Sequence, residues 1–317
     1  MKHVIITGGA GFIGSHLCER FLKLEYAVTA IDNLITGRKS NLANALQSPY
    51  FTFIEQDICQ PIRESTVPFL ATHGLDGIFH FACPASPTDF DRIPFEILAV
   101  DSIGTIQTIR LALQYQSRYV LASTSEVYGD PLVHPQKEDY WGNVNPIGPR
   151  ACYDETKRFA EAYVSTAIRH KGLNGRISRI FNTYGPRMKL DDGRLVPELC
   201  RQLIRDQNLT IHGDGFQTRS FCFVSDLVDG IVRLYESGVQ DPVNLGNPEE
   251  HTILTFSEIL SELAGKTPTV KHLPKRPDDP RKRCPDITRA TELLGWSPRV
   301  SLREGLQVTL DYFRTQL

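Results

Sequence analysis

The chain has 317 residues, which is enough for one large core or for two lobes around a cleft. Hydrophobic residues make up 41% and charged residues 23%, values that are ordinary for a soluble globular protein. The formal net charge of -2 argues against nucleic acid as the main partner, because binding a phosphate backbone requires an excess of Lys and Arg.

Targeting and metal-binding signals are missing from the sequence. No run of about 18 apolar residues occurs, so we expect no membrane-spanning helix. Met1 leads directly into the first predicted strand, and we therefore expect no signal peptide. The seven cysteines are scattered and lack C-x-x-C spacing, which favours reduced thiols in a cytoplasmic protein. The nine histidines show no metal-binding spacing, and we predict no metal site.

The first half of the chain alternates short apolar runs with helix-length amphipathic stretches. We predict buried strands at 4–6, 28–31, 51–54, 77–81 and 119–122, with helices at 12–23 and 103–114 between them. A helix at 153–170 and a strand at 175–180 follow. Repeated strand–helix–strand units predict an α/β fold, namely a Rossmann-type doubly wound parallel sheet.

After Phe181 the pattern is interrupted by Pro and Gly, and a Pro-rich charged stretch runs over 273–285. We predict a Rossmann domain at residues 1–180 and a smaller C-terminal lobe at 181–317. Residues 243–245 look like one more strand of the first sheet. The segment at about 221–250 is therefore expected to return to the first domain.

A glycine-rich turn between the first strand and the first helix predicts a dinucleotide site. Gly8, Gly11 and Gly14 allow backbone N–H groups to approach a pyrophosphate at the helix N-terminus, beside Phe12 and Ile13. Asp32 ends the second strand, where a carboxylate binds the adenosine ribose and favours NAD over NADP. Arg38 and Lys39 nearby weaken that preference. Three further cofactor contacts are expected at strand ends, where ligands of such sheets bind: Asp57, Ile58 and Ala82.

Tyr153 and Lys157 form a Y-x-x-x-K pair on one face of the helix at 153–170. A tyrosine is a poor base at neutral pH, because its ordinary pKa is about 10. A neighbouring ammonium favours the phenolate and lowers that pKa. We therefore expect Tyr153 to take a proton from a hydroxyl while hydride leaves for the cofactor.

The fifth strand ends in Thr124, Ser125 and Glu126. Thr124 can hydrogen-bond the same reacting hydroxyl and complete a Thr–Tyr–Lys set, although Thr124 and Ser125 could equally cap the strand end. Glu126 is a carboxylate at a strand end facing a cleft, which makes it an acid/base candidate.

At these residues the sequence resembles the extended short-chain dehydrogenases that act on nucleotide sugars, and among them the UDP-glucuronate decarboxylases. The similarity covers nearly the whole chain. It rests on residues 7–16, 32–33 with 36–39, 82–87, 123–131, 140–150, 181–188, 217–221, 243–250, and 278–280 with Arg283, Pro285 and Asp286.

The resemblance implies NAD-dependent oxidation at C4 of UDP-glucuronate, loss of CO2 from the 4-keto intermediate, and reduction to UDP-xylose. It implies that Tyr153 is the base, with Thr124 and Ser125 on the sugar and Lys157 on the ribose. Glu126 and Arg283 would bracket the carboxylate and the developing enolate.

The resemblance also implies a homodimer through a helix bundle. Further family positions are the cofactor contacts Asn33, Thr36 and Gly37, and the substrate contacts Pro84, Ser86, Asn182, Arg187, His212, Gln217, Arg219 and Arg283 in the smaller, substrate-binding lobe and its border.

Two positions depart from the family pattern. The family usually has Asn where this chain has Asp101, which adds a negative charge near the site. It usually has an aromatic residue where this chain has His212, which makes the preference for uracil less strict.

Four other activities compete with this interpretation. A nucleotide-hexose 4,6-dehydratase shares Thr124, Tyr153 and Lys157, but it uses an Asp–Glu pair where this chain has Ser125 and Glu126. A 4-epimerase needs no carboxylate-binding arginine such as Arg283. A decarboxylase that releases the UDP-4-keto-pentose would use the same residues. A non-catalytic NAD(H)-sensing regulator would need neither the tyrosine nor the lysine.

Overall fold

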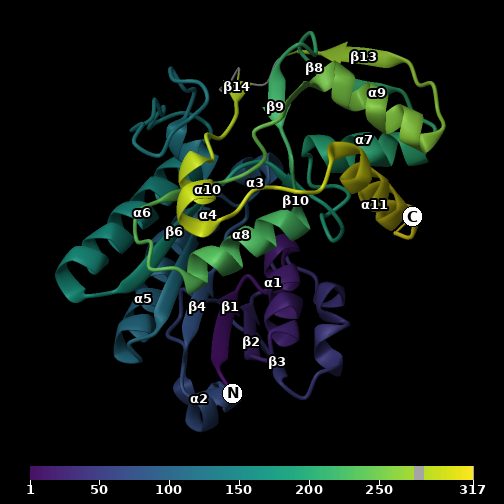
Figure 1. Ribbon diagram of the computed structural model, residues 1–317. Coiled ribbons are helices and arrows are strands. Elements are labelled where there is room, and N and C mark those ends of the chain that lie inside the picture. The colour runs from purple at the N-terminus through teal and green to yellow at the C-terminus, as the bar shows by residue number, and fades with distance from the viewer. Residues whose placement is uncertain (275–281, 317) are drawn as a thin grey trace.

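The computed structural model describes residues 1–274 and 282–316, and a seven-stranded parallel sheet forms its centre (Figure 1). The strand order is β11-β6-β5-β4-β1-β2-β3, so the order reverses between β1 and β4. The strands are β1 (His3–Thr7), β2 (Ala27–Asp32), β3 (Phe51–Glu55), β4 (Gly77–His80), β5 (Arg118–Thr124), β6 (Asn174–Ile180) and β11 (Val243–Leu245). The expected Rossmann-type sheet is therefore confirmed.

Both faces of this sheet are covered by helices, because its strands are apolar on both sides. Val4 and Ile6 point into one core with the helices α1 (Phe12–Lys23) and α8 (Val224–Glu236). Ile5 points into the opposite core with α2 (Pro68–His73), α5 (Thr105–Gln114) and α6 (Ala151–Lys171). The sheet is thus doubly wound.

The helix expected at 103–114 begins earlier than the sequence pattern indicates. A helical run starts with α4 (Pro94–Ala99), continues through a π-helical turn, η4 (Val100–Gly104), and becomes α5. Pro94 occupies the first turn of α4, where its missing N–H costs nothing. The short helix α3 (Pro87–Arg92) precedes this run. The wide turn of η4 places Asp101 in the interior, and Asp101 has no exposed surface.

The C-terminal lobe lies to the upper right of the sheet in Figure 1 and has its own apolar core. Leu199, Phe256 and Leu306 from its three main helices meet in that core. Its helices are α7 (Leu195–Ile204), α9 (Ile253–Ala264) and α11 (Leu302–Arg314). Its strands are β8 (Leu209–His212) paired with β13 (Val270–Leu273), and β9 (Thr218–Ser220) between β12 (Glu250–Thr252) and β14 (Lys282–Arg283).

Several segments connect the lobe to the sheet. The strands β7 (Thr183–Tyr184) and β10 (Cys222–Phe223) pair with each other at the junction. Residues 224–236 form α8, which packs on α1, and β11 pairs with β6 as expected for residues 243–245. The helix α10 (Thr288–Leu294) packs on α8. The boundary at residue 180 remains a prediction.

The remaining elements are short 3-10 turns: η1 (Lys39–Leu42), η2 (Ala45–Gln47), η3 (Glu64–Thr66) and η5 (Ser125–Tyr128). Within residues 1–274 and 282–316, no helix combines the length and the apolar character needed to cross a membrane.

Candidate active site

A cavity of about 690 Å³ opens at the carboxyl ends of the central strands, beside the point where the strand order reverses. Ligands of open α/β sheets bind at this position. Its lining combines the turn after β1 and the ends of β4 and β5 with residues of the C-terminal lobe such as Leu195 and Phe221. All the site residues predicted from the sequence line this cavity except Gly37.

The turn after β1 fits a dinucleotide pyrophosphate. A Cβ on Gly8, whose φ is +69°, would lie 2.5 Å from the carbonyl oxygen of Phe81. A Cβ on Gly14 would lie 2.1 Å from the carbonyl oxygen of Gly8. No side chain caps α1, so its first N–H groups are available to an anion. The residues of this turn that line the cavity are Gly8, Gly11, Phe12, Ile13 and Gly14.

Asp32 lies at the end of β2 with its carboxylate held by the backbone. It accepts hydrogen bonds from the N–H groups of Ala10 at 3.0 Å and Leu34 at 2.8 Å. Burial raises the pKa of Asp32, and these backbone bonds oppose that rise. Gly37 does not line the cavity; a Cβ there would lie 2.8 Å from an oxygen of Asp32. Gly37 thus leaves room for the Asp32 carboxylate. The two residues together fit a site for the ribose of a dinucleotide.

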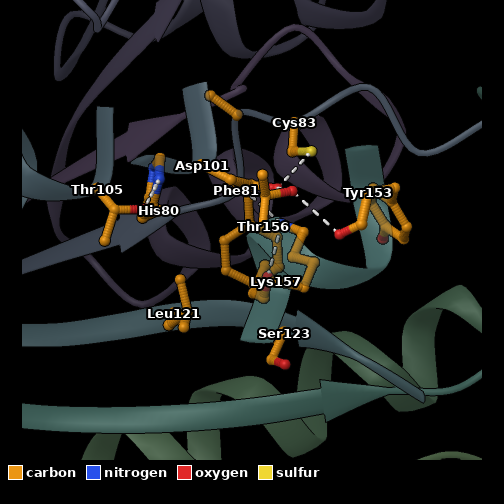
Figure 2. Close-up of polar contacts among 12 residues, drawn as sticks. His80, Phe81, Cys83, Asp101, Thr105, Leu121, Ser123, Tyr153, Thr156 and Lys157 are labelled. Carbon is orange, nitrogen blue, oxygen red and sulfur yellow. Dashed lines mark hydrogen bonds and ion pairs between the residues drawn. The ribbon is translucent and has the colours of Figure 1, made fainter. Parts of the chain in front are cut away.

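Tyr153 and Lys157 face the cavity from one side of α6 (Figure 2). The Lys157 ammonium donates to Asp101 Oδ1 and to the carbonyl oxygen of Ala122, each at 3.0 Å. It lies 5.7 Å from the centre of the Tyr153 ring. Phe90 of α3 stacks on Tyr153, with ring centres 5.1 Å apart.

Burial and charge act on Tyr153 in opposite directions. Burial raises the pKa of Tyr153, while the Lys157 ammonium and a hydrogen bond with Thr124 lower it. The expected effect of Lys157 is therefore present, but burial outweighs it. Burial also lowers the pKa of Lys157, and the Asp101 carboxylate reverses this and raises it above the ordinary value.

The end of β5 supplies three polar groups to the same cavity. Thr124 accepts a hydrogen bond from the N–H of Glu126 at 3.2 Å, so it caps η5 as well as contacting Tyr153. Ser125 is buried beside it.

Glu126 lies between two arginines. Its Oε2 is 2.6 Å from Nη2 of Arg150, and its Oε1 accepts a hydrogen bond from Nη1 of Arg283. Burial favours the neutral acid, but the two guanidiniums outweigh burial and lower the pKa of Glu126. Asp154 lies 3.7 Å from Nε of Arg150, and burial with the Glu126 charge raises its pKa to about 7. Glu126 is consequently an anion between two cations rather than a proton donor.

The predicted substrate contacts lie along the border of the C-terminal lobe. The Ser86 hydroxyl donates to the carbonyl oxygen of Asp192. Gln217 donates to the carbonyl oxygen of His212 at 2.6 Å, and among the described residues its own buried Oε1 has no hydrogen-bond partner. The other predicted contacts that line the cavity there are Pro84, Asn182, Arg187 and Arg219. A ligand with N–H or O–H donors would satisfy Gln217.

Arg187 lies on the cofactor side of the cavity rather than among the other lobe residues. Its Nη2 pairs with Glu19 of α1, while its buried Nη1 finds no hydrogen-bond partner within residues 1–274 and 282–316. Arg187 is expected from the resemblance to contact the substrate, and this position also suits a contact with the cofactor.

The sequence pattern assigned no role to Arg150, Asp154 or Cys83. Arg150 belonged to one of the matching segments, but only the structure places it on Glu126. The family segment 278–280 lies outside the described residues. In residues 1–274 and 282–316, no group of three or more His, Cys, Asp and Glu side chains is arranged to hold a metal ion.

The doubly wound sheet, the glycine-rich turn at its switch point and the buried Tyr–Lys pair define an extended short-chain dehydrogenase. Residues 5–309 match the family model described as GDP-mannose 4,6 dehydratase. UDP-glucuronic acid decarboxylase 1 of Danio rerio is 47% identical over 316 residues, which cover 100% of this chain and 73% of that protein. The first decarboxylase of Arabidopsis thaliana is 48% identical over 314 residues, or 99% and 70% of the two chains. The chain belongs to the UDP-glucuronic acid decarboxylase family.

Solved structures with the same fold act on similar sugars. UDP-glucuronic acid 4-epimerase from Bacillus cereus, in complex with UDP-glucuronic acid and NAD, superimposes with a TM-score of 0.88 at 29% identity, covering 99% of this chain and 100% of that one. UDP-glucose 4-epimerase from Thermotoga maritima, with UDP-glucose, gives a TM-score of 0.87 at 31% identity, covering 99% of each chain. The fold of this chain is therefore shared with NAD- and UDP-sugar-binding proteins.

Proposed function

We propose that the protein converts UDP-glucuronate to UDP-xylose by NAD-dependent decarboxylation. One observation carries this proposal: Glu126 lies between Arg150 and Arg283 in the same cavity as Tyr153. The three charges sum to +1, so a substrate carboxylate would be attracted to them. A C4 enzyme whose substrate carries no carboxylate has no need of such a cluster.

The reaction has three chemical steps. Oxidation at C4 removes a hydride from carbon and a proton from the hydroxyl, leaving a 4-ketone to which the C6 carboxylate is β. The C5–C6 bond then breaks, CO2 leaves, and the electron pair passes through C5 to the carbonyl oxygen as an enolate. A proton adds at C5, and reduction at C4 gives UDP-xylose. NAD, when bound, accepts the hydride from C4 and returns it, so none is consumed.

Proton transfer at C4 is assigned to Tyr153. Its phenol lies on α6 beside Lys157, and Thr124 holds it from the end of β5. Tyr153 takes the proton of the 4-hydroxyl during oxidation and gives it back during reduction. Lys157 stabilises the phenolate and binds the ribose, and Thr124 with Ser125 orients the sugar.

The arginine cluster acts on the carboxylate and on the enolate. Arg283 and Arg150 are buried or nearly so, and a guanidinium keeps its charge and pairs a carboxylate bidentately. The same positive charge stabilises the enolate oxygen when the electron pair arrives. Glu126 fixes the two guanidiniums in position.

The lobe residues are assigned to the UDP half of the substrate. Arg219 neutralises the diphosphate, and Gln217 and Asn182 bind the nucleoside, with His212 beside the uracil. NAD, when bound, would be held at its pyrophosphate by the turn that contains Gly8 and Gly14 and at its ribose by Asp32.

A 4,6-dehydratase is the second candidate, because the matching family model carries that description. Dehydration requires an acid that protonates the departing 6-hydroxyl. Ser125 stands beside Glu126 where that acid is needed, and a serine hydroxyl is a far weaker acid than a carboxyl. The position of Ser125 therefore favours decarboxylation.

The test is to incubate the protein with UDP-glucuronate and NAD and to identify the sugar by NMR. We expect CO2 and UDP-xylose. A UDP-4-keto-pentose with accumulated NADH would restrict the activity to the first two steps. An intact six-carbon product, or turnover of dTDP-glucose but not of UDP-glucuronate, would refute decarboxylation. Full activity of a Tyr153→Phe variant in the cell would favour the sensor instead.

A single variant separates carboxylate chemistry from cofactor binding. Arg283→Ala should lose CO2 release while NAD binding, measured by calorimetry, is retained, because the side-chain hydrogen bonds of Arg283 go to Glu126 and Gly129 and not to the glycine turn. Loss of both would indicate misfolding, and a circular dichroism spectrum distinguishes that case. Retained CO2 release would contradict the assignment.

We further propose a homodimer that forms through α4 and α6. Phe95 and Ile103 are 78% and 47% exposed on the α4–η4 run, and Phe159 of α6 is 41% exposed. Because α4 packs on α6, these exposed side chains come from neighbouring helices. Light scattering on the protein and on a Phe95→Asp variant tests this proposal. A dimer that survives the charge would place the interface elsewhere.

The cytoplasm is the proposed compartment. All seven cysteines have free thiols, and four of them are buried. Reduced thiols are typical of the cytosol. Cell fractionation tests the proposal, and recovery of the mature protein from an oxidising compartment would contradict it.

A further inference from the structure

Asp101 is a buried carboxylate with three side-chain donors around it. It lies in the π-helical turn η4 and has no exposed surface. Lys157 donates to its Oδ1 at 3.0 Å, and the Cys83 thiol and the Thr156 hydroxyl donate to its Oδ2 at 3.0 and 3.3 Å. Figure 2 shows all four side chains meeting above α6.

This arrangement requires an explanation, because burying a charge is costly unless a partner compensates for it. Asp101 and Lys157 form that pair, with side chains that are 0% and 4% exposed. They come from different elements, since η4 packs against α6. Removing one partner would leave the other charge buried and unpaired.

We propose that Asp101 is a positioning residue for the proposed reaction: it holds the Lys157 ammonium in place and offsets its charge at Tyr153. Asp101 acts through Lys157, which carries the contact with the tyrosine ring. The inference rests on the proposed function only in so far as Tyr153 is the base.

The other titratable groups near this pair are neutral. His80 of β4 lies between two threonine hydroxyls, and burial lowers its pKa to about 3. Burial raises the pKa of Cys83, in the loop after β4, and of Tyr119 in β5. Cys59 lies farther from the pair, and burial raises its pKa to about 12. Lys157 and Asp101 are therefore the charged members of this group.

On the cavity side, Tyr153 neighbours the arginine cluster. Arg150 stacks over Phe90 at 5.4 Å, and Phe90 in turn stacks on the Tyr153 ring. Arg150 and Arg283 are bonded to Glu126, and Asp154 lies beside Arg150. The groups that act on the pKa of the Tyr153 phenol include Lys157 and Asp101 and not the arginines of this cluster.

Replacing Asp101 with Asn removes the negative charge and keeps the shape of the side chain. The Tyr153–Lys157 pair then has an uncompensated positive charge in a buried place. In the variant, the Tyr153–Lys157 pair therefore loses its first proton at a lower pH than in the parent, whether that proton leaves the phenol or the ammonium. Loss from the phenol moves the acid limb of the pH–activity profile down. Loss from the ammonium creates an alkaline limb, and both effects move the optimum to lower pH.

The experiment compares the pH dependence of kcat/KM for CO2 release in the parent protein, Asp101→Asn and Thr156→Val. Thr156→Val removes a hydrogen bond to the same carboxylate but leaves the ion pair. We expect the optimum of Asp101→Asn to fall by about one pH unit, since a charge at this range shifts a pKa by that amount or more. The pH optimum of Thr156→Val should be the same as that of the parent protein. If Asp101→Asn had a lower kcat/KM but the same pH optimum as the parent, Asp101 would contribute only to packing, and the proposal would be overturned.

A second measurement needs no substrate, so it separates this inference from the proposed function. In the parent, Asp101 raises the pKa of Lys157, so the pair stabilises the fold fully below the unfolded value of 10.5. In Asp101→Asn, burial alone lowers that pKa, and the variant gains stability as the pH rises toward 10.5. The difference in urea midpoint between the parent and Asp101→Asn should therefore become smaller from pH 7 to pH 9.5. The difference between the parent and Thr156→Val should stay constant over the same range. A constant gap for Asp101→Asn would overturn the proposal, and failure of the parent to release CO2 would overturn only the decarboxylase assignment.

Discussion

Arg150, which precedes α6, bonds Glu126 at the end of β5, with Nη2 and Oε2 2.6 Å apart. The contact joins the element that carries the Tyr–Lys pair to the strand that carries Thr124. It therefore connects the hydride chemistry at C4 with the carboxylate chemistry at C6. A charge-assisted hydrogen bond in a buried place is strong, and breaking it leaves Glu126 with a single guanidinium.

We predict that Arg150→Gln lowers kcat/KM for CO2 release by about 100-fold, equivalent to about 2.7 kcal/mol, within the range for loss of one partner of a buried charge pair. Arg150 is also one of the two charges that lower the pKa of Glu126. Activity of the variant should therefore decline at a higher pH than in the parent when the solution is acidified. Arg169→Gln, at an exposed position of α6, is the control. If the two variants were equally active, Arg150 would have no role in the reaction.

Tyr153→Phe should lower the rate of C4 oxidation by about 10²–10⁴-fold, the usual contribution of a general base. The phenylalanine ring keeps the stacking on Phe90, so stability and NAD binding should be unchanged. NADH formation in a single turnover measures the oxidation step directly. Tyr312→Phe, on α11 in the other lobe, controls for loss of a phenol. A Tyr153→Phe variant with parental NADH formation would assign the base elsewhere.

The parts of the site that lie close together in the sequence could be predicted from it. The glycine turn is set by spacing between neighbouring elements, and Tyr153 and Lys157 share a helix face because they are one turn apart. The role of Asp32 could be predicted because it stands at the end of the second strand. Each of these depends on local geometry that the residue types themselves determine.

The contacts between distant segments could not be predicted from the local pattern, although the family resemblance places Glu126 and Arg283 at the same substrate carboxylate. Lys157 and Asp101 are 56 positions apart, and Arg283 reaches Glu126 across 157 positions. Nothing in the pattern around Asp101 indicates a π-helical turn, because its apolar spacing fits an ordinary helix. The side on which that carboxylate lies depends on the packing of η4 against α6.

The glycine turn can be tested with a pair of alanine variants. A Cβ on Gly14 would lie 2.1 Å from the carbonyl oxygen of Gly8, so the backbone must shift, whereas Gly238 has no atom within 4 Å. Gly14→Ala should weaken NAD binding at least tenfold and lower the free energy of unfolding by about 1–3 kcal/mol, the cost of overpacking. Gly238→Ala should change neither by more than experimental error. Calorimetry and urea unfolding measure both, and similar behaviour of the two variants would argue against a close turn.

Buried histidines make the fold sensitive to acid. His80 is held between Thr7 and Thr105 at 2.9 and 3.1 Å, and burial lowers its pKa to about 3. Burial likewise lowers the pKa of His16 to about 4. In the unfolded chain both groups titrate near 6.5, so below that pH the unfolded state binds more protons than the folded state.

The free energy of unfolding should therefore fall as the pH drops from 6.5 toward 4. Each fully coupled histidine contributes a slope of about 1.4 kcal/mol per pH unit, so the two together give about 2.7 kcal/mol per unit near pH 5. Urea unfolding at pH 7, 6 and 5 measures the slope. His80→Gln cannot take up a proton in either state and should have a slope lower by about 1.4 kcal/mol per pH unit. If that variant and the parent lost stability in parallel, His80 would be charged in the folded protein, and its place between two hydroxyls would need a different explanation.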